Sequence, residues 1–117
     1  ISRKKEIDIL EKQDTDCNYL IQVNIDNDPK KNGVNKNEIF SFYEYCIEKK
    51  INAVGLMTIP DINSEPKIVF SKMQQLNEQL IIDYGYKGEL SMGMSNDYEV
   101  ALDYGATIVR IGTKLFT

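Results

Sequence analysis

Apolar residues recur with the period of a helix in two long segments of the chain, residues 36–50 and 65–83. In each segment they stand three or four positions apart, which places them on one face of a helix that packs on a sheet. These residues are Ile39, Phe42, Tyr43, Cys46 and Ile47 in the first segment, and Val69, Met73, Leu76 and Leu80 in the second. We therefore expect two amphipathic helices in the middle of the chain.

Two shorter helices are expected nearer the ends. The first covers residues 3–13 and is capped by the serine that precedes it. The second begins at Ser95 or Asn96 and runs to Tyr104, and Gly105 then follows as glycine commonly follows the last turn of a helix.

Four further segments have the composition of strands. Residues 17–25 are rich in β-branched and aromatic side chains, and residues 52–59 form an apolar run of the kind found in parallel strands that are covered on both sides. Shorter strands are expected at residues 90–94 and 106–111. The segment 26–35 contains Asp-Pro and Asn-Gly and predicts a loop.

Helices and strands therefore alternate along the chain as α-β-α-β-α-β-α-β, which is typical of parallel strands joined by right-handed crossovers. An open doubly wound sheet fits this order, and so does part of a (β/α)8 barrel, which takes about 250 residues when complete. Residues 1–117 read as one α/β unit whose four strands would make half of a barrel. The chain begins without Met and stops directly after an apolar run, so we expect a piece of a larger protein.

Composition excludes several classes of function. Of the 117 residues 42% are hydrophobic and 27% are charged, and the net charge of −4 disfavours binding to nucleic acid or anionic membranes. No apolar run reaches the roughly 18 residues of a membrane span. Histidine is absent, which excludes Ser-His and Cys-His catalysis and most zinc sites. Cys17 and Cys46 have no motif spacing and are expected as free thiols of a cytoplasmic protein.

Ligands of parallel α/β proteins bind at the carboxyl ends of the strands. At one such end Ser91, Gly93 and Ser95 surround a turn that opens a helix, which is how an anion site is built. An ordinary capped helix after a short turn explains the same residues. Gln22 and Asn24 share one face of the first strand, where they are either interior or edge polar residues.

A second candidate lies at the end of the last strand. An isolated buried charge is costly, so Arg110 in an apolar strand needs a partner. That partner is either an acidic residue such as Asp97 or Glu99, or a bound anion. Gly112 and Thr113 offer backbone N–H groups and a hydroxyl to a phosphate, and phosphates often bind after the last two strands of a barrel. This agreement favours a phosphate site.

Three segments carry a more specific pattern when they are taken together. They are Gly55-Leu56-Met57-Thr58-Ile59, Leu90-Ser91-Met92-Gly93-Met94-Ser95-Asn96-Asp97 and Val109-Arg110-Ile111-Gly112-Thr113-Lys114-Leu115-Phe116. This combination resembles the pyridoxal-phosphate homeostasis protein family, which is related to the N-terminal barrel domain of alanine racemase. The resemblance extends over nearly the whole chain.

The resemblance implies a (β/α)8 barrel that holds pyridoxal 5′-phosphate (PLP) at its mouth. It implies that the phosphate is cradled by residues of the serine-glycine turn and of the last strand end, namely Ser91, Gly93, Met94, Ser95, Gly112 and Thr113. It also implies that Arg110 faces the pyridine nitrogen and that Met57 lies near the ring, although Met57 on its own reads as a core residue.

Two features of the family are missing from this chain: the lysine that carries PLP covalently, and a Gly-Glu-Asn segment of the same half of the barrel. The chain therefore matches the C-terminal half, with Thr117 where the family often has glycine. An arginine can only donate a hydrogen bond to the ring nitrogen, which weakens the electron sink that many PLP enzymes use. We expect a protein of PLP homeostasis and supply, not an enzyme.

The expected partners are PLP, phosphate or sulfate ions, and PLP-dependent apo-enzymes that receive the cofactor. A half barrel leaves strand edges and an apolar inner face uncovered, so we also expect self-association or pairing with the missing half. Two alternatives stay open at this point. One is a fragment of a PLP-dependent racemase-like enzyme, and the other is a flavodoxin-like regulator of a phosphorylated ligand, for which Asp26 and Asp28 are the nearest acidic pair.

Overall fold

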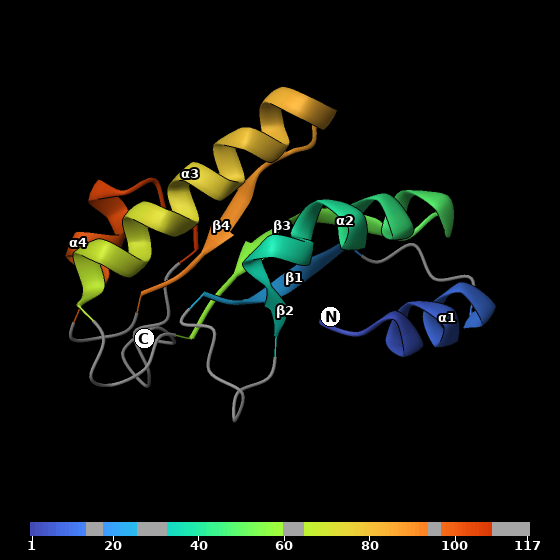
Figure 1. Ribbon diagram of the computed structural model, residues 1–117. Coiled ribbons are helices and arrows are strands. Elements are labelled where there is room, and N and C mark those ends of the chain that lie inside the picture. Colours follow the sequence, from blue (N-terminus) through green and yellow to red (C-terminus); the bar gives the residue numbers. More distant parts are fainter. Residues whose placement is uncertain (14–17, 26–32, 60–64, 94–96, 109–117) are drawn as a thin grey trace, which may run out of the picture.

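The computed structural model describes residues 1–13, 18–25, 33–59, 65–93 and 97–108 (Figure 1). Its elements, in chain order, are α1 (Lys4–Gln13), β1 (Asn18–Asn24), β2 (Val34–Asn35), the 3-10 helix η1 (Lys36–Glu38), α2 (Ile39–Glu48), β3 (Asn52–Met57), α3 (Pro66–Tyr84), β4 (Glu89–Ser91) and α4 (Tyr98–Asp103). The strands form one parallel sheet in the order β2-β1-β3-β4. Ile108 adds a parallel bridge to Ser91 at the far side of β4.

The expected loop at residues 26–35 is wrong at its end. Val34 and Asn35 form β2, which pairs with Val23 and Asn24 of β1. Gly33 makes this approach possible, because an added Cβ there would lie only 2.7 Å from the Asn24 amide nitrogen. The side chain of Asn35 then accepts a hydrogen bond from the Asn37 N–H at 3.1 Å and so caps η1.

The helix that we expect to begin at Ser95 or Asn96 is α4, and it begins at a later residue than expected. α4 starts at Tyr98, and Asp97 in the cap position has a non-helical backbone and no capping hydrogen bond from its side chain. Ser95 and Asn96 themselves lie outside the described residues. The predicted end of the helix is confirmed, since Gly105 follows it with a φ of 90° and donates its N–H to the Leu102 carbonyl at 3.1 Å.

The role of Ser2 at the start of α1 also differs from the expected one, in which its side chain accepts a hydrogen bond as the helix cap. The N–H of Ser2 donates to the Glu6 carboxylate at 3.1 Å, and its hydroxyl lies 3.4 Å from the same oxygen. Ser2 therefore ties the chain to the first turn by donating hydrogen bonds to a side chain three residues into the helix.

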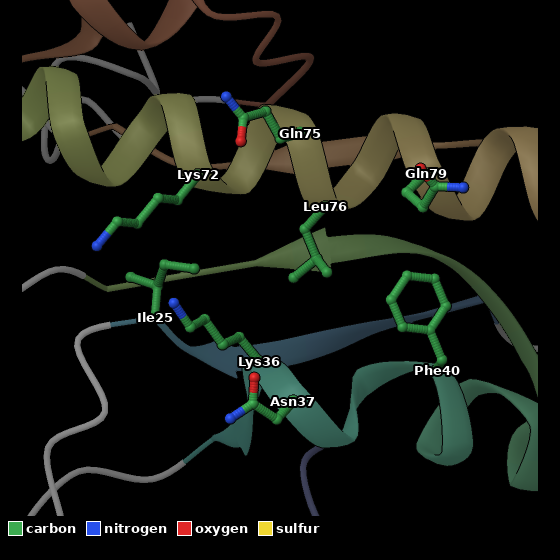
Figure 2. Close-up of a pocket in the computed structure, with 8 residues that line it drawn as sticks. All are labelled: Ile25, Lys36, Asn37, Phe40, Lys72, Gln75, Leu76 and Gln79. Carbon is green, nitrogen blue, oxygen red and sulfur yellow. The ribbon is translucent and has the colours of Figure 1, made fainter.

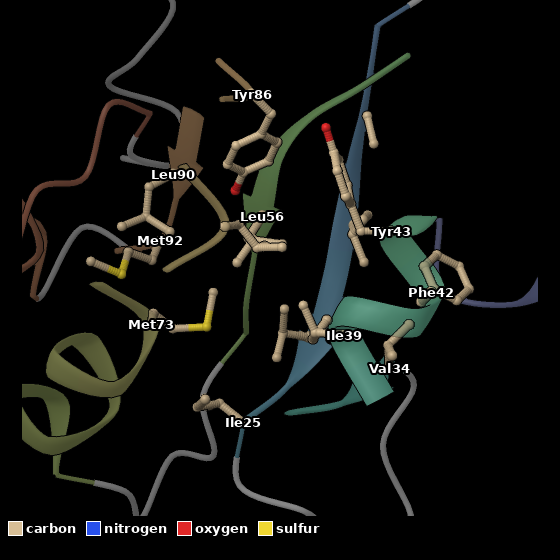
Figure 3. Packing of buried hydrophobic residues seen from close by; sticks show 14 of the residues in the cluster. Ile25, Val34, Ile39, Phe42, Tyr43, Leu56, Met73, Tyr86, Leu90 and Met92 are labelled. Atoms are coloured by element: carbon tan, nitrogen blue, oxygen red, sulfur yellow. The ribbon is translucent and has the colours of Figure 1, made fainter. Parts of the chain in front are cut away.

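Helices α2 and α3 cover the same face of the sheet. Leu56 of β3 and Leu90 of β4 are in register and point towards the helices, where they meet Tyr43 of α2 and Met73 of α3 (Figure 3). α4 contacts α3 and α1 contacts α2. A doubly wound sheet carries helices on both faces, whereas the wall of a barrel carries them on one. The described elements have the one-sided cover of a barrel wall.

Gly55 brings β3 and β4 together. A Cβ at this position would lie 2.0 Å from the carbonyl oxygen of Glu89, a distance that no real contact permits. Gly55 is paired with Glu89 in the sheet, and Met57 is paired with Ser91 two positions further along. The missing side chain of Gly55 thus allows the strand pairing that places Met57 beside Ser91.

A buried network of hydrogen bonds holds the segment between α3 and β4 against α3. The Tyr86 hydroxyl donates a hydrogen bond to Asn77 Oδ1, and Asn77 Nδ2 donates to the Gly88 carbonyl at 2.9 Å. The ring of Tyr43 packs against Tyr84 and Tyr86 with centroid distances of 4.8 and 5.2 Å. Burial raises the pKa of the Tyr86 hydroxyl, so this group stays a hydrogen-bond donor.

Candidate binding site at the carboxyl edge of the sheet

The side chains of three strands form one row across the inner face of the sheet, opposite the helices. Gln22 of β1 is in register with Met57 of β3, and Met57 is in register with Ser91 of β4. Paired residues of neighbouring parallel strands point to the same face, and the strands lie about 4.8 Å apart. Ile108 continues the row through its bridge to Ser91. The sheet therefore brings Met57 and Ser91 side by side.

Ser91 lies at the point where β4 ends. It is 3% exposed, and its carbonyl accepts a hydrogen bond from the Thr58 N–H at 3.1 Å. Gly93 follows on the same face, is buried, and has a φ of 101°. That conformation is strained for residues with a side chain, so glycine is required where the chain leaves the strand. The positive φ of Gly93 agrees with the turn that the sequence predicts at this residue.

Thr58 ties the ends of two strands together and is not among the residues selected from the sequence. Its side chain is 1% exposed, and its hydroxyl donates to the Val23 carbonyl at 3.1 Å. Asn24 follows Val23 and is partly buried on the inner face. The period of two in β1 already indicates that Gln22 and Asn24 share a face, whereas the contact of Thr58 requires the register of β1 and β3.

The predicted site residues divide into two groups. Met57, Ser91 and Gly93 are described, and the structure brings them together at one edge of the sheet. The remaining predicted residues lie outside the described part of the chain. They are Met94, Ser95, Arg110, Gly112 and Thr113.

The row formed by Gln22, Met57 and Ser91 carries no charged side chain. The nearest carboxylate of the paired strands is Glu89, two positions before Ser91, or about 7 Å along the strand. The Thr107 hydroxyl donates to Glu89 at 2.6 Å and lowers the pKa of its carboxyl group, and Lys87 lies 3.5 Å away. This negative charge is thus already paired at the opposite end of β4, and the described residues of the row bring no negative charge to the carboxyl edge.

Other chemistry is not supported by the described residues. Among them no three His, Cys, Asp or Glu side chains are grouped closely enough to hold a metal ion. Cys46 is a free thiol without exposure to solvent, as expected, and Cys17 lies outside the described part. Within the described ranges, none of the helices has both the length and the apolar character needed to span a membrane.

Comparisons with known proteins give relatives that share one name. No protein-family model matches the chain. It is 43% identical over 102 residues to the pyridoxal phosphate homeostasis protein of Aquifex aeolicus, and the match covers 83% of this chain and 45% of that protein. The protein of the same name from Schizosaccharomyces pombe is 35% identical over 104 residues, which cover 85% of this chain and 44% of the relative. The chain spans about half the length of the curated relatives that it matches.

Solved structures agree on the fold. PipY from Synechococcus elongatus, solved without PLP, superposes with a TM-score of 0.83 at 24% identity, over all of this chain and 59% of the other. The form of PipY with PLP bound has a TM-score of 0.77 at 22% identity and covers 97% of this chain and 55% of the other. An arginine decarboxylase from Paramecium bursaria Chlorella virus follows at 0.70 and 18% identity, covering 94% of this chain and 37% of the other. These neighbours are (β/α)8 barrels, so the predicted fold, half of such a barrel, is confirmed.

Proposed function

Because the chain belongs to the family of pyridoxal phosphate homeostasis proteins and spans about half of their length, we propose that it supplies the half of a barrel that binds the phosphate and the pyridine nitrogen of PLP. The single observation that carries this proposal is the row in which Met57 lies beside Ser91, with Gly93 turning the chain directly after it. A buried hydroxyl-bearing residue and a backbone turn at the carboxyl edge of parallel strands suit a phosphate ester.

The other predicted residues complete the proposed site. Ser95, Gly112 and Thr113 hold the phosphate through hydroxyl and N–H groups, with Met94 in the same turn. Arg110 stands two positions after Ile108 in the sequence, and Ile108 bridges Ser91. We assign it a hydrogen bond to the pyridine nitrogen, which keeps that nitrogen unprotonated because arginine retains its own proton. When bound, PLP would supply an aldehyde and a pyridine ring, and the lysine that holds it covalently would come from the other half.

The side of β1 that faces away from β3 is paired with β2 only at Val23 and Asn24, and it supports the pairing of this chain with another half barrel. The N-terminal ammonium of Ile1 donates to the Leu20 carbonyl at 2.9 Å, and the Gln22 N–H donates to the Ile1 carbonyl at 2.8 Å. This is the hydrogen-bond pattern of a parallel strand neighbour. We propose that this side of the sheet is completed by the other half of the barrel or by a second copy. We also propose that the assembled protein holds PLP in the cytoplasm for delivery to apo-enzymes and does not catalyse a reaction itself.

Equilibrium dialysis of PLP against the chain and its variants tests the site. We expect Arg110→Glu and Ser95→Ala each to weaken PLP binding by about tenfold or more, because each removes a charge-assisted or direct hydrogen bond. Arg3→Glu is the matched control for charge, since Arg3 is exposed, directly precedes α1 and lies 3.7 Å from the Glu6 carboxylate. Ser71→Ala on α3 is the control for the loss of a hydroxyl. Pyridoxal without phosphate should bind much more weakly than PLP.

Two results would overturn this proposal. Unchanged PLP binding in both Arg110→Glu and Ser95→Ala would remove the assignment of the site. A stable covalent adduct on one lysine of this chain, after reduction with borohydride and peptide mapping, would show that the chain carries its own anchor for PLP.

A further inference from the structure

A hollow lies on the helical side of the sheet, away from the row of Met57 and Ser91. It has a volume of about 330 Å³ and lies between α3 and the segment of η1 and α2 (Figure 2). Its lining residues come from four elements or their ends and are Ile25, Lys36, Asn37, Phe40, Lys72, Gln75, Leu76 and Gln79. The volume is at the lower end of the range of small-molecule sites. We call this hollow the α2–α3 groove.

Two lysines give the α2–α3 groove its charge. Lys36 and Lys72 line it, and none of its described lining residues is a carboxylate. Neither lysine forms an ion pair with another residue of the described ranges. Figure 2 shows both ammonium groups at the same end of the groove, on either side of Ile25. In a chain where 18 acidic residues outnumber 14 basic ones, two neighbouring cations without acidic partners among the described residues mark a place that suits an anion.

The floor of the groove is apolar. Ile25 is 4% exposed, and Phe40 and Leu76 are partly buried and pack against the hydrophobic core. Figure 2 shows the Phe40 ring and Leu76 next to each other, further from the two ammonium groups than Ile25 is. The amides of Asn37 and Gln75 line the groove, and the Gln79 side chain donates to Asp83 at 2.9 Å. A cationic end and an apolar floor therefore adjoin within one hollow.

We propose that the α2–α3 groove binds a small phosphate monoester whose other part is an aromatic ring. The two ammonium groups neutralise the dianion, and the ring lies on Phe40 and Leu76, where its apolar surface is removed from water. This site lies on the opposite face of the sheet from the site proposed for the pyridine ring and phosphate of PLP. Its existence does not depend on that proposal.

Titration of the ¹⁵N-labelled chain with phenyl phosphate, followed by NMR, tests the groove. We expect saturable shifts of the amide signals of Asn37, Phe40 and Gln75, and about tenfold weaker binding in the double variant Lys36→Met/Lys72→Met. Lys67→Met is the matched control, because Lys67 is exposed on α3 and does not line the groove. Arg110→Glu, which removes the proposed PLP contact, should leave the shifts of Asn37, Phe40 and Gln75 unchanged, because these residues line the groove on the other face of the sheet.

The comparison ligands decide which part of the proposal fails. Phenol should bind much more weakly than phenyl phosphate, and inorganic phosphate should also bind more weakly. Equal binding of phenol would show that the lysines are not used, and equal binding of inorganic phosphate would show that the apolar floor is not used. Either result overturns the proposal, as does the absence of saturable shifts or an unaltered affinity in the double lysine variant.

Discussion

The two faces of the sheet differ in almost every physical respect. On the helical face, Leu56 and Leu90 are fully or nearly fully buried beneath α2 and α3. On the inner face, the neighbouring residues Gln22 and Met57 remain partly exposed. Successive residues of one strand thus belong to opposite environments, although they are adjacent in the sequence. The stability of the described structure comes from one face, and the proposed ligand chemistry lies on the other.

This division explains where polar groups are tolerated. On the helical side the described residues contain no buried side-chain nitrogen or oxygen without a hydrogen-bond partner, and Asn77 is held between Tyr86 and Gly88. On the inner face Gln22 and Asn24 are only partly buried and retain access to water. A ligand that binds the inner face would therefore displace water and leave the packed core unchanged.

The largest expected effect concerns the position where β3 and β4 approach most closely. Gly55→Ala would place a Cβ 2.0 Å from the Glu89 carbonyl oxygen, so the strands would have to separate. We expect a loss of about 4 kcal/mol or more in the free energy of unfolding, measured by urea denaturation. Gly85→Ala is the control: Gly85 has a φ of 65° but no atom within 4 Å of an added Cβ, so only backbone strain of about 1 kcal/mol is expected. Similar losses in both variants would contradict the close approach.

A pair of neighbouring substitutions tests the difference between the faces directly. Leu56→Ala removes a side chain with 0% exposure and should cost about 3 kcal/mol in the free energy of unfolding. Met57→Ala removes a partly exposed side chain of the inner face and should cost about 1 kcal/mol or less. Met57→Ala should in addition weaken PLP binding, whereas Leu56→Ala, where still folded, should not. Equal stability losses would mean that the inner face is as tightly packed as the helical face.

Much of the fold follows from the sequence because its signals are local. The spacing of apolar residues in α2 and α3 predicts both helices to within a few residues, and the apolar run of residues 52–59 predicts a parallel strand. β2 is missed because Val34 and Asn35 follow loop residues and form a strand only through pairing with β1. The bulge between β1 and β3 near Leu20 is likewise a property of two strands together.

The candidate site could be predicted only in part. Ser91 and Gly93 are recognisable from their motif, whereas only the family resemblance predicts that Met57 belongs to the site. Their proximity depends on the register that Gly55 allows, which no single segment contains. The α2–α3 groove has no sequence signal. Lys36 and Lys72 are 36 positions apart in the sequence, and they line one groove only after the helices have packed.

Alkaline pH should lower the free energy of unfolding through a buried thiol on the helical face, Cys46 of α2. Burial raises the pKa of the Cys46 thiol from 9.0 to about 11. The unfolded chain ionises first, so the stabilisation is complete below pH 9 and is lost progressively as the pH rises towards 11. A shift of this size, at about 1.36 kcal/mol for each pKa unit, corresponds to roughly 3 kcal/mol. We expect urea unfolding to show this loss between pH 9 and about 11.

A substitution of Cys46 tests whether its thiol causes this loss of stability at alkaline pH. Cys46→Ala should flatten the dependence of the free energy of unfolding on pH above about pH 9, even though the variant is less stable at neutral pH. The remaining slope is attributed to buried tyrosines, because burial also raises the pKa of Tyr86 and of Tyr43. An unchanged slope in Cys46→Ala would show that this thiol does not titrate on unfolding.

The smallest expected effect compares two tyrosines that pack on the same ring. Tyr84 and Tyr86 both contact Tyr43, but it is the Tyr86 hydroxyl that donates to the buried side chain of Asn77. Tyr86→Phe preserves the ring and leaves the Asn77 oxygen without its donor, which should cost about 1 kcal/mol in the free energy of unfolding. Tyr84→Phe should cost less, because Tyr84 is only partly buried and water can replace its hydroxyl contact. If both variants lose the same stability, the ring contacts alone close the connection between α3 and β4, and the polar network contributes nothing to the helical face.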